Sequence, residues 1–346
     1  MSRQALGPFL AVLAVACTQV PLDPRSRVVT PRVLGIVAEP PEARPGQLVA
    51  LHAIVGGASP RTTFRWILCT RPEATTSFTA SSSFGTSAAD EGCFGDAAVG
   101  AIEIGRGRDA FFAVPSDWLQ QLERLRAVYG SRLSAATLRR IAQTIGLVVT
   151  VSLEVIDPLA DAGYGTSQLP LRAIKRVVIV DRPDTNHNPP SPAFELRIAT
   201  GDAGTGPPSD AGTGVRIRMA AEIGDAEHCV PYPPQEVAIR RGRHMVIAPD
   251  IESEAMWLEP YDAYDASGTL QRYEEAAFYS FYSTVGPLNP DRTRSPGSNP
   301  STPAPEGVRN SAWTAPGTAG RVTHWVIVRD GRGGTSGCSF EVDVVP

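Results

Sequence analysis

Side chains that carry oxygen atoms recur at near-alternate positions in one short stretch of the sequence. Asp181, Asp184, Asn186 and Asn188 offer carboxylate or amide oxygens within a proline-rich segment. Calcium takes about six to eight oxygen ligands, so this spacing suits a weak calcium site. The alternative is a run of Asx turns without a metal, because these side chains also bind their own backbone. We therefore expect no cofactor, and calcium is the one metal that the pattern suggests.

Residues that could catalyse hydrolysis or redox chemistry form no familiar motif. The sequence has no G-x-S-x-G, H-E-x-x-H, P-loop or C-x-x-C pattern. The five histidines are scattered without ligand spacing, and His52 and His324 fall in predicted strands, where we expect packing or surface roles. The acidic residues between Asp250 and Asp265 indicate a solvated face. We expect a protein that is not an enzyme.

The first sixteen residues are typical of a targeting segment. Arg3 supplies the positive charge at its start, and the uncharged run that follows is too short to span a bilayer stably. Residues Leu13 to Cys17 read L-A-V-A-C, which resembles the lipobox of bacterial lipoproteins. The resemblance implies that Cys17 is lipidated and becomes the new amino terminus. Because Gln19 is not the aspartate that retains such proteins in the inner membrane, it implies export and anchoring in the outer membrane, on its periplasmic or cell-surface face. The alternative is an ordinary signal peptide with an incidental Cys17.

The chain length and the frequent glycine and proline residues indicate two domains built from short strands and turns. We expect a mostly β protein with two β-sandwich domains and a short helical hairpin inserted in the first. The predicted parts are a signal peptide (1–16), a tether (17–31), a first domain (32–181), a linker (182–192) and a second domain (193–346).

In the first domain, apolar runs between turn residues predict strands at 32–37, 48–55, 64–69, 147–156 and 171–180. Apolar residues at helical spacing, with Ser116 and Ser134 as caps, predict the helical hairpin at 116–146. The order strand, P-x-x-x-x-P-G turn, strand, and strand with Trp66 resembles the first half of an immunoglobulin-like domain. That resemblance implies that Trp66 points into the core.

In the second domain, strands are predicted near 194–199, 215–221, 236–239, 244–248, 255–258, 277–283, 322–329 and 339–345, with a loop at 201–214. The closing segment from Val322 resembles the final hairpin of bacterial PKD-type, immunoglobulin-like domains, and 313–317 resembles their penultimate strand. Gly331, Gly333 and Gly334 suit a turn that needs positive φ.

The cysteines other than Cys17 are even in number, which indicates disulfides in an oxidising compartment. Four cysteines can pair in three ways. Two of them lie on each side of the predicted linker, and a bridge within a domain is favoured over one between domains. We therefore predict the pairs Cys69–Cys93 and Cys229–Cys338.

The net charge of -4 argues against a nucleic-acid partner, which would favour a basic patch. We expect a non-enzymatic envelope or cell-surface lipoprotein that presents immunoglobulin-like modules for structural or adhesive contacts. Its partners would be the membrane, through the lipid anchor, and an unknown protein or glycan. The alternative is a periplasmic carbohydrate-binding accessory protein, or an enzyme whose site is built from loops. Exposed aromatic residues near Trp257, Tyr261, Tyr264 and Tyr273 would favour sugar binding, and paired carboxylates in a deep pocket would favour an enzyme.

Overall fold

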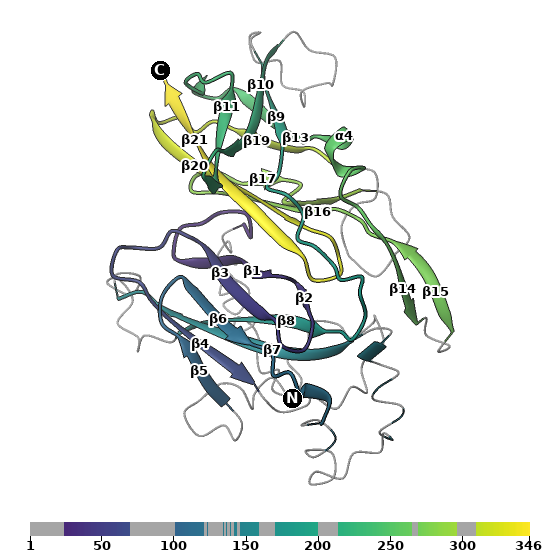
Figure 1. Ribbon diagram of the computed structural model, residues 1–346. Helices are drawn as coiled ribbons and strands as arrows, with labels where there is room; N and C mark the ends of the chain where they lie inside the picture. The colour runs from purple at the N-terminus through teal and green to yellow at the C-terminus, as the bar shows by residue number, and fades with distance from the viewer. Residues whose placement is uncertain are drawn as a thin grey trace, which may run out of the picture.

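The computed structural model describes residues 24–69, 101–120, 147–158, 170–199, 214–264, 269–295 and 309–346, together with single positions between 121 and 146. Within these residues the chain is mostly β, as predicted from the sequence. The strands form two sandwich-like units, one below the other in Figure 1, and each unit has its own hydrophobic core. No described helix is long and apolar enough to cross a bilayer.

The lower unit in Figure 1 packs a three-stranded sheet against a five-stranded sheet. The smaller sheet has the order β1 (Arg32–Glu39), β3 (Leu48–Gly56) and β6 (Asp109–Ala113). The larger sheet has the order β2 (Glu42–Ala43), β8 (Leu171–Ile179), β7 (Leu147–Ile156), β4 (Thr63–Cys69) and β5 (Ala101–Gly105). Alternating side chains such as Val49, Leu51 and Ala53 point inward and build the core between the sheets.

Trp66 lies at the centre of this core, as predicted. Its side chain is fully buried, and its indole Nε1 donates a hydrogen bond to the carbonyl oxygen of Gly107 at 2.9 Å. Gly107 lies in the turn between β5 and β6, two strands that the sequence analysis did not find. The indole therefore fixes this turn as well as filling the core, because a buried N–H needs an acceptor.

The described positions of 116–146 include helical residues, at Trp118–Gln120, Glu123, Ala136, Arg139 and Ala142–Gln143. Trp118 and Ala142 are buried against the lower core. The rest of this segment lies outside the described residues, so the two-helix hairpin stays a prediction.

The upper unit in Figure 1 contains an eleven-stranded sheet that folds around one core. Its strands, in chain order, are β9 (Phe194–Ala199), β10 (Gly214–Glu222), β11 (Asp225–Tyr232), β12 (Ala238–Arg240), β13 (His244–Pro249), β16 (Phe278–Ser283), β17 (Leu288–Asn289), β18 (Arg292–Arg294), β19 (Ser311–Thr314), β20 (Gly320–Arg329) and β21 (Thr335–Val345). Along the sheet their order is β17-β19-β13-β9-β10-β11-β21-β20-β16-β18, and β12 also pairs with β21. Side chains from both halves, including Phe194, Trp313 and Phe340, share the core.

The predicted closing hairpin is present. β20 and β21 pair antiparallel from Gly320 opposite Val344 to Arg329 opposite Thr335, and the glycine-rich turn joins them. The segment 313–317 contributes to β19, which lies in the other half of the sheet and pairs with β13 and β17. β21 is the central element, because it pairs with β20, β11 and β12.

One strand prediction in this unit is wrong, and the sequence analysis missed β11, β14, β15, β17 and β18. Residues 255–258 follow a short helix, α4 (Ile251–Glu254), which Asp250 caps by accepting a hydrogen bond from the backbone N–H of Glu252. β14 (Pro260–Tyr264) and β15 (Leu270–Glu274) then form a separate antiparallel hairpin, which extends away from the large sheet in Figure 1.

The acidic residues of 250–265 do not all face solvent, contrary to the sequence expectation. Glu254 is buried, accepts a hydrogen bond from the Tyr279 hydroxyl at 3.1 Å, and forms an ion pair with Arg309 at 2.8 Å. Burial raises the pKa of Glu254, although Arg309 opposes the rise. The arginine that stabilises this carboxylate is distant in sequence, so the local pattern gave no sign of it.

Candidate functional site: the junction between the two units

The two units meet through apolar side chains from both. Val28, Leu34, Ile54 and Ile327 form a buried cluster of their own, and Trp325, Tyr282 and Val37 are partly buried against it. Gly337 of β21 permits the approach, because a Cβ at this position would collide with Ile327 and crowd Ile54. Burying an aliphatic side chain of this size contributes roughly 1.5–3 kcal/mol, so the cluster stabilises the contact between the two units.

Beside this cluster, the buried guanidinium of Arg332 joins three segments. Arg332 lies in the turn between β20 and β21, and its Nη2 binds Glu42 Oε1 at 2.9 Å while its Nη1 binds Glu275 Oε1 at 3.0 Å. The side chains of Arg332, Glu42 and Glu275 are only 9%, 5% and 1% exposed. Arg182, from the predicted linker, binds the other oxygen of Glu42 at 2.7 Å. Breaking such a buried pair costs several kcal/mol, because the remaining charge has no solvent.

The conformation of the β20–β21 turn places Arg332 in this position. Asp330 Oδ1 accepts hydrogen bonds from the backbone N–H groups of Arg332, Gly333 and Gly334 at 2.7, 3.0 and 2.9 Å. Gly331 and Gly333 have φ of 83° and 118°, which confirms the prediction for these two positions. Gly334 is needed for a different reason, since a Cβ there would collide with the Asp330 carboxylate.

Two ionisable groups at the junction are strongly perturbed. Burial raises the pKa of the Glu275 carboxyl to about 7, and the charge of Asp330 adds to the rise, against the opposing effects of the Glu259 backbone N–H and Arg332. Burial lowers the pKa of the Lys175 amine to about 8. Lys175, the single lysine of the chain, binds the carbonyl oxygen of Gly333 and lies 3.5 Å from Thr335 Oγ1. The junction therefore holds groups that titrate near neutral pH.

The predicted linker is packed into the same junction. The Asn186 backbone N–H donates to Glu42 Oε2 at 2.9 Å, and its side-chain Nδ2 donates to Asp330 Oδ2 at 2.8 Å. Asn188 Nδ2 donates to the carbonyl oxygen of Ala38 at 2.7 Å, and its Oδ1 accepts from the Thr335 backbone N–H at 2.8 Å. Asn186 and Asn188 therefore connect β1 and β2 of the lower unit to the turn and β21 of the upper unit, Asn186 through its backbone as well as its side chain.

The four residues of the candidate calcium site do not share one role in this arrangement. Asp181 and Asp184 are exposed, whereas Asn186 is buried and Asn188 is half-buried in the contacts just described. No described residues form a group of three or more His, Cys, Asp or Glu side chains suited to a metal. Calcium at these four positions stays a prediction, and it would compete with the Thr335 backbone N–H for the Asn188 amide oxygen.

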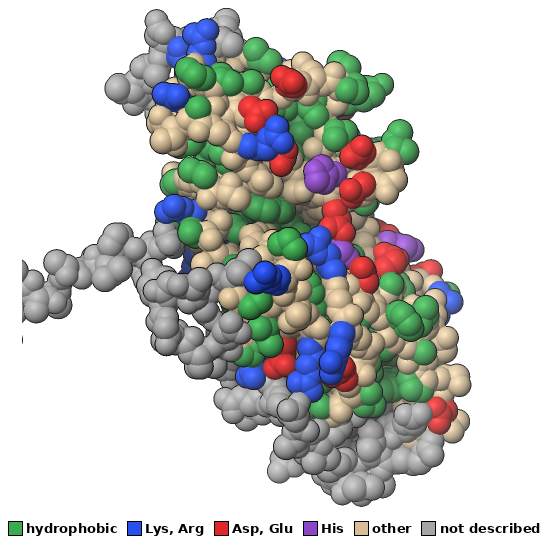
Figure 2. Space-filling model, turned by 90° about the vertical axis from the view of Figure 1, so that its left-hand side faces the viewer, with side chains coloured by type: hydrophobic (Ala, Val, Ile, Leu, Met, Phe, Trp, Pro, Cys, Tyr) green, Lys and Arg blue, Asp and Glu red, His purple; other side chains and the backbone are tan. Residues whose placement is uncertain are grey.

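His52 forms a second polar contact across the junction. Its Nδ1 lies 2.6 Å from Asp109 Oδ1 on β6, and its Nε2 lies 2.7 Å from Glu227 Oε1 on β11 of the upper unit. Arg108 also reaches Glu227, at 3.6 Å. Burial disfavours the charged imidazole, but the hydrogen bonds to Glu227 and Asp109 outweigh it and raise the pKa of His52. On the face of the molecule drawn in Figure 2, histidine, acidic and basic side chains gather around the middle.

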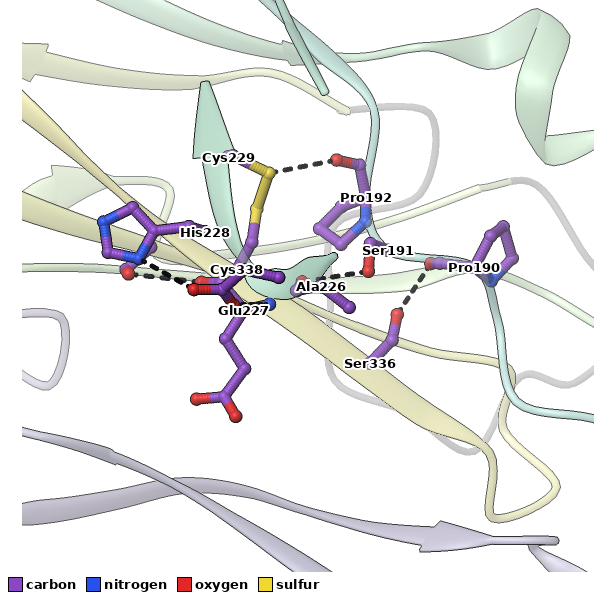
Figure 3. Close-up of a disulfide and its surroundings, with 11 residues drawn as sticks. Pro190, Ser191, Pro192, Ala226, Glu227, His228, Cys229, Ser336 and Cys338 are labelled. Carbon is purple, nitrogen blue, oxygen red and sulfur yellow. Dashed lines mark hydrogen bonds and ion pairs between the residues drawn. A yellow bond between two sulfur atoms is a disulfide. The ribbon is translucent and has the colours of Figure 1, made fainter. Parts of the chain in front are cut away.

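The disulfide of the upper unit stands where it was predicted. Cys229 of β11 and Cys338 of β21 are buried and bonded to each other. The end of the predicted linker runs past this disulfide in Figure 3. The carbonyl oxygen of Pro192 lies 3.5 Å from the Cys229 sulfur, and the Ser336 hydroxyl donates a hydrogen bond to the Pro190 carbonyl at 2.7 Å. Cys69 is also disulfide-bonded. Its predicted partner Cys93, and the predicted lipidation site Cys17, lie outside the described residues.

Two of the four aromatic residues singled out in the sequence lie together. Tyr261 and Tyr273 are opposite each other on β14 and β15, and their rings stack with centroids 5.7 Å apart. Arg332 covers Tyr261, with its guanidinium carbon 4.9 Å from the ring centroid. Trp257 packs against the upper core. The tyrosine pair thus extends the junction onto the hairpin.

The described groups of the junction are suited to holding two units in one geometry. Glu42, Glu275 and Asp330 are held by arginine, asparagine or backbone N–H donors, whereas Asp109 and Glu227 are held by His52 and Arg108. The sequence analysis missed Glu42, Arg332 and His52 as junction residues. Hydrogen bonds such as Arg332–Glu42 connect residues 290 positions apart, and only the folded chain brings such residues together.

No protein-family model matches the chain, and no curated protein matches it. Among solved structures, it is similar to a mutant of Salmonella alpha-2-macroglobulin, with 9% identity and a TM-score of 0.19 over 90% of this chain and 16% of that one. It is also similar to E. coli alpha-2-macroglobulin in its native conformation, with 10% identity and a TM-score of 0.18 over 91% of this chain and 16% of that one. The chain thus spans a small part of these structures, and the overlap assigns it to no family.

Proposed function

We propose that the protein is a non-enzymatic lipoprotein of the outer envelope or cell surface, anchored through Cys17, that presents two immunoglobulin-like β-domains as one rigid pair for structural or adhesive contacts. The observation that carries the proposal is the junction. The linker residues, the closing turn and β2 share one buried hydrogen-bonded network, so neither unit is a freely hinged module. A fixed pair of domains suits a protein whose task is to hold a partner at a set place.

The disulfides support an exported protein. Cys229–Cys338 is buried in the upper core, and Cys69 is also bonded. Such bonds form and persist in oxidising compartments and are rare in the cytosol. This agrees with the targeting segment and the lipobox that the sequence predicts.

The chemistry of the buried acids supports a role without catalysis. Glu42 and Glu275 share Arg332, and Glu254 is held by Arg309 and Tyr279. A general acid or base must reach a substrate proton, and these carboxylates are instead committed to cationic or hydroxyl partners inside the fold. Purified residues 18–346 should give no turnover with esterase, peptidase or glycosidase substrates. Turnover that one acidic or histidine substitution abolishes would contradict this part of the proposal.

The anchor is tested by cell fractionation. Cys17→Ser should release the protein from membranes into the soluble periplasmic fraction, while the matched variant Thr18→Ser should remain with the outer membrane. A Cys17→Ser protein that still sediments with membranes after a wash in high salt, which removes proteins held by charge alone, would rule out the lipid anchor.

The runner-up function is that of a periplasmic carbohydrate-binding accessory protein, or an enzyme with a site built from loops. The stacked Tyr261 and Tyr273 favour the sugar-binding version, because sugars pack on aromatic faces. Since Arg332 covers Tyr261, glycan binding should depend on Tyr273. The test is a glycan array, with Tyr232→Ala at an exposed tyrosine of β11 as the control. A binding signal that Tyr273→Ala removes and Tyr232→Ala keeps would favour this function over the first.

A further inference from the structure

The segment that precedes β1 is fixed to both units. The Ser26 hydroxyl accepts a hydrogen bond from the Leu288 backbone N–H at 3.1 Å, and the Ser26 carbonyl accepts one from Ser283 at 2.8 Å. The Val28 N–H donates to the Ser283 carbonyl at 2.8 Å, and the Val28 side chain is buried in the apolar cluster of the junction. Residues 24–28 of the predicted tether are therefore part of the folded body.

Four arginines lie next to this fixed segment and are linked to one another through backbone carbonyls, Ser280 and strand pairing; we call them the row. The Arg32 guanidinium binds the carbonyl oxygen of Arg25. Two residues further along β1, the Leu34 carbonyl accepts from Arg329 Nη2 at 2.7 Å, and Arg329 Nη1 donates to Ser280 Oγ at 3.2 Å. Ser280 is paired with Arg292 across β16 and β18.

Charge and exposure distinguish this row from the arginines of the junction. Arg25 and Arg292 are exposed, and Arg32 and Arg329 are half-buried. Within the part of the chain that the structure describes, none of the four forms an ion pair with a carboxylate. By contrast, Arg332, Arg182 and Arg309 are each held by a glutamate. The row is thus a local positive surface on a protein whose net charge is -4.

We infer that the row formed by Arg25, Arg32, Arg292 and Arg329 is a membrane-facing surface that binds the anionic headgroups of the bilayer to which the protein is anchored. The inference rests on the proposed anchor at Cys17. Only residues 18–23 separate Cys17 from the fixed segment, and that length of chain reaches about 25 Å at most. The arginines next to its end therefore stay within about 25 Å of the anchored residue, a span that includes contact with the lipid surface.

The distance matters because electrostatic attraction to a membrane falls off within a Debye length, about 8–10 Å at physiological salt. A long tether would leave the arginines outside this range for most of the time. A tether that reaches about 25 Å at most lets the arginines enter this range repeatedly, and their binding to the phosphates would turn this side of the domain pair toward the bilayer. The partner is thus an acidic phospholipid surface, recognised by charge.

The test measures co-sedimentation with vesicles at low ionic strength, using the chain from residue 17 onward with Cys17→Ser, so that no lipid anchor contributes. We expect binding to vesicles of phosphatidylcholine mixed with phosphatidylglycerol, and none to phosphatidylcholine alone. The triple variant Arg25→Gln, Arg32→Gln, Arg292→Gln should lower the affinity by about a hundredfold, since each basic residue near an acidic bilayer contributes about fivefold. Added salt should weaken binding of the unsubstituted chain.

A second triple variant controls for the loss of charge as such. Arg176→Gln, Arg218→Gln and Arg241→Gln remove three exposed arginines elsewhere on the surface and should leave binding unchanged. No binding to the acidic vesicles, or equal loss in both triple variants, would overturn the inference. A failed anchor would show separately, as the absence of lipid on Cys17 in the mass of the mature protein, because binding of the arginines to a bilayer does not change that mass.

Discussion

His324 offers the sharpest test of the upper core. It lies on β20 with a fully buried side chain, and within the described structure neither ring nitrogen has a hydrogen-bond partner. The ring meets Trp313 edge-on, with centroids 4.7 Å apart, and stacks on Phe340 at 5.1 Å. Burial in this aromatic environment lowers the pKa of His324 to about 3, because a charged imidazole would have neither water nor a counter-ion there.

The sign of the effect on stability follows from where the proton binds. In the unfolded chain His324 takes up a proton near its ordinary pKa of 6.5, whereas the folded chain excludes it until about pH 3. The folded state therefore loses stability as the pH falls below 6.5. At about pH 4.5, two units below the ordinary pKa, this loss is about 3 kcal/mol.

The perturbation is His324→Phe, with His324→Leu as a second variant in case the larger ring does not fit. Neither variant binds a proton here. The difference in unfolding free energy between each variant and the unsubstituted protein should therefore shift by about 3 kcal/mol in favour of the variant from pH 7 to pH 4.5. Amide hydrogen exchange of peptides from β20 and β21 measures the free energy of opening, and peptides from β7 in the lower unit are the internal control. If variant and unsubstituted protein lose stability in parallel between these pH values, His324 titrates freely and the reasoning is refuted.

Three further outcomes are expected. Arg332→Met should lower the free energy of unfolding by about 3 kcal/mol or more at pH 8, and by less at pH 6, where Glu275 can protonate. Thermal melting at both pH values measures this, and equal losses would contradict the role of Glu275. Replacing both Cys229 and Cys338 by alanine should cost about 5 kcal/mol, since the bridge closes a loop with a sequence separation of 109, and chemical denaturation with and without reductant checks it. If the linker binds calcium, millimolar calcium should raise the melting temperature, and an unchanged curve would end that hypothesis.

Local patterns in the sequence predicted what local physics determines. Apolar alternation predicted β1, β3, β4, β7 and β8 closely, and the glycine-rich turn predicted the β20–β21 hairpin. Counting cysteines on either side of the linker predicted Cys229–Cys338. These features depend on neighbours along the chain or on a simple division of it.

Features that depend on distant partners could not be found in this way. β5, β6 and β11 are short or carry polar residues, and they become strands because neighbouring strands complete their hydrogen bonds. The strand expected at 255–258 was wrong because Asp250 caps a helical turn just before it. The roles of Arg332 and His52 exist only once residues from both units meet.

The place of β21 after the other described strands along the chain has a consequence for the order of folding. This strand pairs with three others, carries Cys338, and follows the turn that holds Arg332. A polypeptide synthesised amino terminus first therefore supplies every strand of the lower unit before it supplies β21. The lower unit can then assemble early, whereas the pairing of β20, β11 and β12 with a shared neighbour, the Cys229–Cys338 bridge and the contact of Arg332 with Glu42 all wait for β21 and its turn.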